Sequence, residues 1–118
     1  VGHNPHGARF LWQQLPAAQP GQRTHAVLAM LRDKDIAGVI AASQAFVDDW
    51  WPAGLDGPRA CSLADLSAIF RAQGIATEIG HANVVDALQA ARHKAKAGDR
   101  IIVFGSFYTV AAILARGG

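Results

Sequence analysis

Two histidines, an asparagine and a proline follow one another in the sequence His3-Asn4-Pro5-His6. Asn is a preferred helix N-cap and Pro is favoured at the first helical position, so a helix is expected to begin at about Pro5. The imidazoles would then lie at the positive end of that helix, where a phosphate or a carboxylate is stabilised. His3 precedes the helix and is the candidate for chemistry, whereas His6 lies inside the first turn and is more consistent with capping or packing.

Three later loops also concentrate polar side chains, at residues 32–35, 56–59 and 105–108. Lys34 and Asp35 could contact a ligand, or they could simply begin a helix that Asp35 caps. Arg59 carries a guanidinium suited to binding a carboxylate through two hydrogen bonds, and a solvated turn arginine is an equal alternative. Ser106 is expected at a helix N-terminus, where its hydroxyl and free amides could bind a carboxylate or a phosphate.

These loops are separated by short apolar runs that alternate with segments of helical spacing. Strands are expected at residues 25–31, 46–52, 75–79 and 100–104, and helices from about residue 5 and at residues 36–45, 63–73, 84–97 and 106–116. Asp35, Ser62 and Asn83 are the expected N-caps. Such alternation implies an α/β fold with an open, mostly parallel sheet of about four strands and helices on both faces.

In an open parallel sheet, ligands bind at the carboxyl ends of the strands. The four polar loops all fall at that edge, whereas residues 16–22 and 97–99 at the other edge have the composition of plain connectors. The sequence therefore predicts one site, at one edge of the sheet.

The remaining residues that could carry chemistry point to packing instead. Trp50 and Trp51 are adjacent in an expected strand, so their rings should lie on opposite faces. Cys61 has no neighbouring histidine in the sequence and is expected to be a small buried residue rather than a nucleophile. The other histidines share no metal-ligand spacing, and no metal site is expected; they are His25, His81 and His93.

The composition is that of one folded domain, with 118 residues, 51% hydrophobic, 17% charged and a net charge of +2. A compact chain of this length has a radius of gyration of about 13 Å. The basic residues are scattered, so nucleic-acid binding is not expected.

With one cysteine, no signal peptide and no apolar run long enough for a membrane span, we expect a cytoplasmic protein with no membrane partner. The missing initial methionine predicts a piece of a longer protein, whose preceding residues supply another strand.

Four phrases carry a family resemblance: His3-Asn4-Pro5-His6, residues 30–38, Gly57-Pro58-Arg59-Ala60 and residues 103–110. Together they resemble the C-terminal domain of the bacterial bifunctional dihydrofolate synthase/folylpolyglutamate synthase family, within the Mur ligase superfamily. The His-Asn-Pro motif is shared by Mur ligases, whereas Asp33-Lys34-Asp35 and the phrase GSFYTV are specific to the folate branch. The resemblance covers essentially the whole chain and implies a Rossmann-like domain.

The resemblance implies one domain of an ATP-dependent acid–amino acid ligase. ATP phosphorylates a pterin-linked carboxylate, and the amine of L-glutamate attacks the acyl phosphate, so that glutamate is joined to dihydropteroate or folate. The implied cofactors are ATP and Mg²⁺, held mainly by an N-terminal P-loop domain of the same protein, because this chain contains no G-x-x-x-x-G-K-[ST] sequence. The chain by itself is therefore expected to be inactive.

The resemblance also assigns roles to individual residues. It places His3 close to the nucleotide and the reacting phosphate, as a catalytic and nucleotide-binding candidate. Asn4 and Pro5 complete the motif and are the other nucleotide-binding candidates. It places Ser106 on the amino-acid side of the cleft, as a catalytic and substrate-binding candidate. The other substrate-binding candidates are Lys34, Asp35, Arg59 and Tyr108.

Two alternatives stay open from the sequence. A peptidoglycan-precursor Mur ligase also adds an amino acid to a carboxylate, although Asp33-Lys34-Asp35 and GSFYTV argue against it. A stand-alone module that binds an amino acid or a nucleotide would also lack a P-loop.

Overall fold

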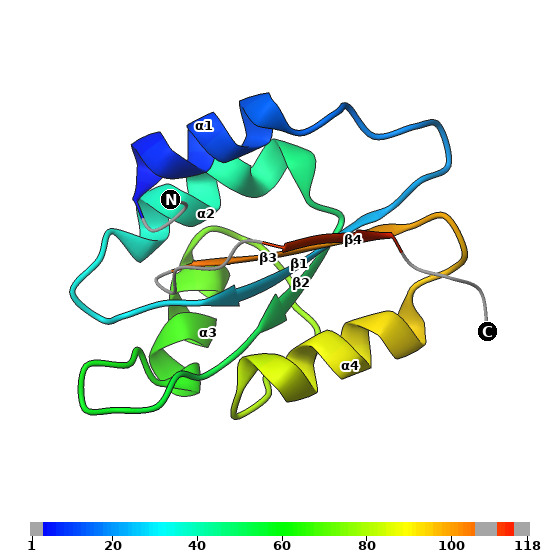
Figure 1. Ribbon diagram of the computed structural model, residues 1–118. Coiled ribbons are helices and arrows are strands. Elements are labelled where there is room, and N and C mark those ends of the chain that lie inside the picture. The colour runs from blue at the N-terminus through cyan, green and yellow to red at the C-terminus, as the bar shows by residue number, and fades with distance from the viewer. Residues whose placement is uncertain (1–3, 106–110, 115–118) are drawn as a thin grey trace.

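The computed structural model describes residues 4–105 and the backbone of residues 111–114. One sheet with the strand order β2-β1-β3-β4 lies between helices on its two faces. Figure 1 shows α1 and α2 side by side above the sheet and α4 below it. The elements are α1 (Pro5–Gln14), β1 (Thr24–Ala29), α2 (Ile36–Ser43), η1 (Gln44–Phe46), β2 (Asp49–Pro52), α3 (Leu63–Ala72), α4 (Val84–Lys94), β3 (Arg100–Gly105) and β4 (Ala111–Leu114).

β1 lies in the middle of the parallel part of the sheet. It pairs with β2 on one side and β3 on the other, both parallel, and β4 adds an antiparallel strand to β3. Every residue of β1 and β3 is buried, which accounts for their near-continuous apolar runs. The predicted open, mostly parallel α/β sheet is therefore confirmed. The radius of gyration of the chain is 13.1 Å, close to the value expected for a compact chain of this length.

The two faces of the sheet carry separate cores. Leu28 of β1 faces the core beneath α1, α2 and α3, whereas Val27 faces the core beneath α4. Trp50 belongs to the first core and Trp51 to the second, so the prediction that their rings lie on opposite faces is confirmed. The large rings of the first core come from four different elements: Trp12, Trp50, Phe70 and Phe104.

The helices begin where the sequence predicts, because each predicted cap binds a backbone amide of the first turn. The side chain of Asp35 accepts from the amide of Gly38, and the side chains of Ser62 and Asn83 cap α3 and α4 in the same way. Capping satisfies a donor that has no partner within the helix.

A buried histidine ties the amino ends of the strands together. His25 is 2% exposed, and its Nδ1 accepts a hydrogen bond from the indole Nε1 of Trp51 at 3.2 Å. The ring proton therefore lies on Nε2, which donates to Asp99 at 3.3 Å. Burial acts to raise the pKa of Asp99, but the backbone amides of Lys96 and Arg23 and the ring of His25 outweigh it and hold that pKa below its usual range.

The prediction of a strand at residues 75–79 is wrong. In a strand, residues 75 and 79 would share a face, yet Ile75 packs against the first core and Ile79 is 78% exposed. The segment gives β2 only scattered hydrogen bonds, such as that from the amide of Glu78 to the carbonyl of Trp50. The strand predicted at residues 46–52 also begins later, at Asp49, because the chain makes a 3-10 turn after α2.

The prediction of a last helix at residues 106–116 is wrong where the structure describes that segment. Ala111–Leu114 form β4, with Ala111 opposite Val103 and Leu114 opposite Arg100. The backbone bonds of an open sheet edge outweigh the modest helical preference of this alanine-containing run. Over the described residues, the helices are all too short or too polar to cross a bilayer.

Candidate functional site at the carboxyl edge of the sheet

The loops that follow β1 and β2 are joined through their backbones. The amide of Arg32 donates to the carbonyl of Arg59 at 2.8 Å, and the amide of Cys61 donates to the carbonyl of Met30 at 3.0 Å. The loop at residues 56–59 turns at Gly57, whose φ of +101° lies in the region that favours glycine. Two of the four predicted loops, residues 32–35 and 56–59, therefore form one unit.

An ion pair between Asp33 and Arg59 fastens this unit on its solvent side. Nη2 of Arg59 donates to Oδ2 of Asp33 at 2.5 Å, and the two side chains are 50% exposed for Asp33 and 59% for Arg59. The hydrogen bond from Arg59 holds the pKa of Asp33 below its usual range, although desolvation opposes it. A guanidinium has five N–H donors, so Arg59 keeps donors for an anionic ligand.

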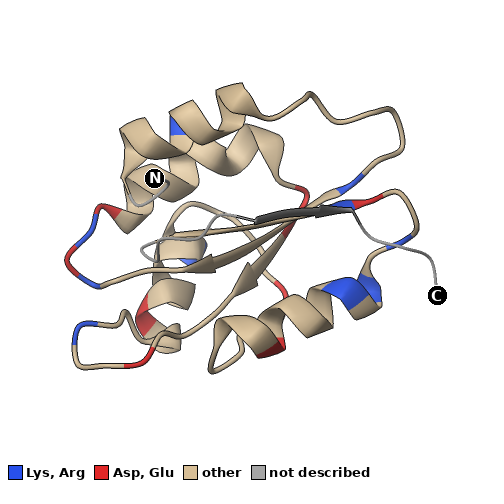
Figure 2. Ribbon diagram, in the orientation of Figure 1, with Lys and Arg blue, Asp and Glu red and all other residues tan. Residues whose placement is uncertain are grey.

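Asp33 is not among the residues singled out from the sequence, and its place in Asp33-Lys34-Asp35 is the only signal that points to it. Figure 2 shows basic and acidic residues alternating along the loop of residues 32–35. This alternation does not reveal which acid meets which base, because the partner of Asp33 comes from the next loop.

Lys34 and Asp35 lie where the chain enters α2. Oδ1 of Asp35 accepts from the amide of Gly38 at 3.0 Å, so part of this carboxylate is used as a helix cap. Lys34 is half-buried. A Cβ on Gly38 would lie 2.5 Å from both Oδ2 of Asp35 and Cγ of Pro5, so glycine at this position lets the beginnings of α1 and α2 lie against each other.

Asn4 and Pro5 begin α1 as predicted. Oδ1 of Asn4 accepts from the amide of Gly7 at 2.7 Å, and Pro5 occupies the first helical turn. His6 is exposed within that turn. The motif therefore has a structural task, because it fixes the point at which the chain turns into the helix directly after His3.

β3 ends at Gly105, which lies tightly against the backbone of β1. Its φ is +144°, and a Cβ at this position would overlap the carbonyl oxygen of Ala29. Only glycine fits here, so the first residue of the Gly105-Ser106 pair is required by the packing of two strands.

Three predicted site residues, His3, Ser106 and Tyr108, lie outside the described residues. The placement of Ser106 at a helix N-terminus loses its support, because the run expected to form that helix contains β4. The roles of these residues stay predictions.

Cys61 has the properties of a packing residue. It is 4% exposed, and burial raises the pKa of its thiol, with a further contribution from Asp65. Within residues 4–105, no three His, Cys, Asp or Glu side chains gather closely enough to hold a metal ion.

The described parts of all four loops thus meet around the carboxyl end of β1. Two helix N-termini, those of α1 and α2, lie together there, and Arg59 adds an exposed guanidinium that is paired with Asp33, two residues before the cap of α2. Helix N-termini and guanidinium groups both stabilise anions, so this edge is suited to carboxylate or phosphate groups.

The chain is similar to known proteins over nearly its whole length. The chain is 40% identical over 114 residues to a dihydrofolate synthase/folylpolyglutamate synthase of Escherichia coli (strain K12), a match that covers 97% of this chain and 26% of the relative. The bifunctional folylpolyglutamate synthase/dihydrofolate synthase from Yersinia pestis CO92 gives a TM-score of 0.77 and 37% identity, covering 90% of this chain and 24% of that one. A structure of such a bifunctional enzyme with Mn, AMPPNP and L-glutamate bound gives a TM-score of 0.78 and 36% identity, covering 93% of this chain and 26% of that one.

The chain therefore spans about a quarter of the length of these relatives. Residues 1–107 match the family described as the glutamate ligase domain of Mur ligases. The family resemblance carried by the four sequence phrases is confirmed, and the chain belongs to the Mur ligase glutamate ligase domain family.

Proposed function

We propose that this chain is the C-terminal domain of an ATP-dependent ligase that joins L-glutamate to dihydropteroate, to folate, or to both. In this reaction the γ-phosphoryl group of ATP passes to a carboxylate of the pterin substrate, giving an acyl phosphate and ADP. The amine of glutamate then attacks the carbonyl carbon, loses a proton and displaces inorganic phosphate. An amide bond remains.

The observation that carries the proposal is the 40% identity to a dihydrofolate synthase/folylpolyglutamate synthase over 97% of this chain. The carboxyl edge supports it chemically, because ATP, glutamate and the pterin carboxylate are all anionic where they react. Arg59 and the N-termini of α1 and α2 supply groups of the opposite polarity.

The cofactors of the complete protein are, in this proposal, ATP and Mg²⁺. A similar structure contains AMPPNP and Mn. The cationic side chains and helix N-termini at the carboxyl edge fit phosphate or carboxylate oxygens, whereas a metal ion requires oxygen, nitrogen or sulfur ligands. An N-terminal P-loop domain of the same protein would therefore hold most of the triphosphate and the metal.

Individual roles follow from the motif and from the observed contacts. His3 lies beside the reacting phosphate, and Asn4 and Pro5 position it by fixing the start of α1. Ser106 and Tyr108 contact the incoming glutamate. Arg59, held by Asp33, binds a carboxylate with help from Lys34, while Asp35 keeps the start of α2 in place.

Genetic complementation tests the proposal. The complete gene that encodes this chain is expressed in a strain that lacks its own folate ligase, as wild type and with His3→Ala or Ser106→Ala. Wild type should restore growth and both variants should fail to do so at equal protein levels. His93→Ala is the matched control, because His93 is exposed near the end of α4.

Failure of a well-expressed wild type would reject glutamate and pterin as substrates. Rescue by His3→Ala would instead reject the catalytic role of His3 while leaving the reaction in place. A purified-enzyme assay separates loss of activity from loss of folding, since a catalytic change should lower kcat with little effect on Tm.

A further inference from the structure

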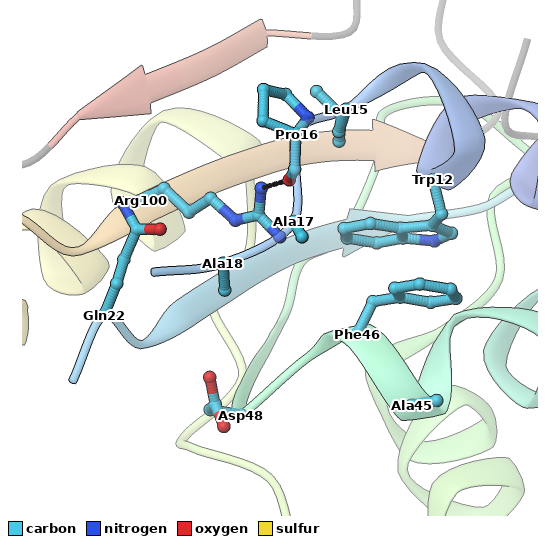
Figure 3. A pocket seen from close by; sticks show the side chains of 10 residues that line it. All are labelled: Trp12, Leu15, Pro16, Ala17, Ala18, Gln22, Ala45, Phe46, Asp48 and Arg100. Carbon is cyan, nitrogen blue, oxygen red and sulfur yellow. Dashed lines mark hydrogen bonds between the residues drawn. The ribbon is translucent and has the colours of Figure 1, made fainter. Parts of the chain in front are cut away.

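A pocket of about 380 Å³ lies at the amino edge of the sheet, away from the loops discussed so far. Its floor includes Arg100, the first residue of β3, and one wall comes from α1 and η1. Figure 3 shows the stacked rings of Trp12 and Phe46 on one side and the guanidinium of Arg100 on the other. The lining residues also include small side chains, Ala17, Ala18 and Ala45.

Arg100 is a buried cation with neutral hydrogen-bond partners. It is 8% exposed, its Nε donates to Oγ1 of Thr24 at 2.7 Å, and its Nη1 donates to the carbonyl of Pro16 at 2.5 Å. Among the described residues, no acidic side chain forms an ion pair with it. A guanidinium has five donors, and the two bonds leave others available on the side of the pocket.

This arrangement differs from that of the other buried charged groups. Asp99 receives hydrogen bonds from two backbone amides and from His25. Arg100 has two neutral acceptors, and among the described residues no anionic partner balances its charge, which makes its burial costly. An anion in the pocket would supply it.

The aromatic wall selects a ligand with a flat part. The rings of Trp12 and Phe46 are stacked with centroids 5.3 Å apart and an angle of 3° between their planes. Trp12 is held from behind by the hydrogen bond from its indole Nε1 to Oγ of Ser43. Phe46 is 45% exposed, so its ring leaves apolar surface that a ligand in the pocket could cover.

Asp48 also lines the pocket, but its carboxylate is turned to the backbone. Oδ2 of Asp48 accepts from the amide of Thr24 at 2.7 Å. Gln22 is engaged as well, since its side chain bonds to the carbonyl of Gly98 and to the amide of Gln19. Arg100 is therefore the charged lining side chain that can donate hydrogen bonds to a ligand.

We propose that this pocket binds a small organic anion with an aromatic ring, whose carboxylate or phosphate accepts hydrogen bonds from Arg100 and whose ring packs against Phe46 and Trp12. The proposal is independent of the ligase reaction assigned to the carboxyl edge, because none of its lining residues belongs to those loops.

The test uses three probes that share a phenyl ring and differ in charge: phenylacetate, benzyl alcohol and 2-phenylethylamine. Binding is followed by NMR through the indole N–H of Trp12 and the ring protons of Phe46, with phenyl phosphate distinguishing phosphate from carboxylate recognition. Phenylacetate or phenyl phosphate should shift these signals, and the neutral and cationic probes should bind about tenfold more weakly or worse, as expected for loss of a charge-assisted hydrogen bond.

Variants locate the binding. Phe46→Ala removes one ring of the aromatic wall, and Ala18→Leu fills the pocket while leaving Arg100 itself unchanged. Phe10→Ala is the matched control, because Phe10 is similarly exposed (52%) but does not line the pocket. Both pocket variants should weaken anion binding by about tenfold or more, and the control should not. Arg100→Lys, which retains the charge, should bind better than Arg100→Gln.

If Arg100→Gln fails to fold, Phe46→Ala and Ala18→Leu still decide the question. Equal binding of the anion and benzyl alcohol would overturn the proposal. The same is true if the anions leave the Trp12 signal unchanged at tens of millimolar, or if both pocket variants bind them as tightly as the wild type.

Discussion

Arg59 illustrates how a side chain can matter for binding while contributing little to stability. It and Asp33 are both about half exposed, and exposed ion pairs contribute little to the free energy of unfolding. Their value is geometric, since the pair holds a guanidinium between two loops at the carboxyl edge. The pair therefore belongs to the site rather than to the core.

We expect Arg59→Gln to raise the KM for glutamate in the complete protein by about tenfold or more, because a charge-assisted hydrogen bond to a carboxylate is lost. Tm should change little. Steady-state kinetics with varied glutamate, beside thermal unfolding, measures both, and Arg71→Gln on the exposed face of α3 is the control.

If Asp33 acts by positioning Arg59, Asp33→Asn should raise the same KM by a smaller factor. The double variant should then behave as Arg59→Gln alone, because Asp33 has nothing left to position. Independent, multiplying effects of the two substitutions would show that Asp33 acts on the substrate by another route.

Asp99 gives the stability of the chain a pH dependence. Its pKa is lower in the folded protein than the ordinary value of 3.8, so the folded state binds this proton more weakly than the unfolded state does. The resulting stabilisation is complete above that ordinary value and is lost as the pH falls through the lowered pKa.

In urea unfolding between pH 7 and pH 3, the free energy of unfolding of Asp99→Asn should therefore fall less steeply toward acid than that of the wild type. Asp56→Asn, in an exposed loop, should retain the wild-type slope. Parallel curves for wild type and Asp99→Asn would remove Asp99 as a source of the acid sensitivity.

At the scale of elements, the ends of β1 and β3 show why a motif glycine is required. Gly105 combines a φ of +144° with contact to the backbone of Ala29, whereas Gly21 has a φ of +80° but open space around it. A methyl group at Gly105 would meet both backbone strain and a clash with Ala29, whereas a methyl group at Gly21 would meet backbone strain alone.

We expect Gly105→Ala to destabilise the chain by more than about 2 kcal/mol, since two strands must separate to admit the methyl group. Gly21→Ala should cost about 1 kcal/mol. Chemical denaturation of the two variants measures the difference, and equal losses would mean that the contact with Ala29 adjusts freely.

The helix starts are the elements that the sequence predicts best. Asn4, Asp35, Ser62 and Asn83 each act on an amide within three residues, so the information is local. Strand pairing is not local, and this explains the two errors. Residues 75–79 have an apolar strand-like composition but lie beside β2 without a ladder, and residues 111–114 join β3 because its edge is open.

The same distinction applies to the site. The gathering of the four loops at one edge follows from the order of strands and helices, so the sequence could predict it. The pairing of Asp33 with Arg59 depends on the turn at Gly57 and on the backbone bond between the loops, which bring together residues 26 positions apart. Nothing in the local sequence around either residue encodes that contact.

For the whole molecule, the two layers of helices are packed with different kinds of side chain. The first layer contributes rings and long aliphatic side chains such as Trp12 and Phe70, whereas α4 meets the sheet mainly through Ala87 and Ala91. Less apolar area is removed from water by alanine than by tryptophan or phenylalanine, so α4 is the more weakly attached layer.

Native-state hydrogen exchange should reflect this difference. Amides of β1 and β3, which are wholly buried, should exchange most slowly, and those of α4 should exchange faster than those of α3. Exchange of α4 at the rate of β1 would show instead that the layer and the sheet open together.

The two adjacent tryptophans offer a way to watch the layers separately. Trp50 touches the aromatic side chains Phe70 and Phe104 on one face, and Trp51 is bonded to the imidazole of His25 on the other. With Trp12 and one of the pair replaced by phenylalanine, the fluorescence of the remaining indole reports on a single face. Unfolding followed with each single-tryptophan variant would show whether the two faces lose their packing in one step or in turn, so the chain carries one optical reporter for each of its layers.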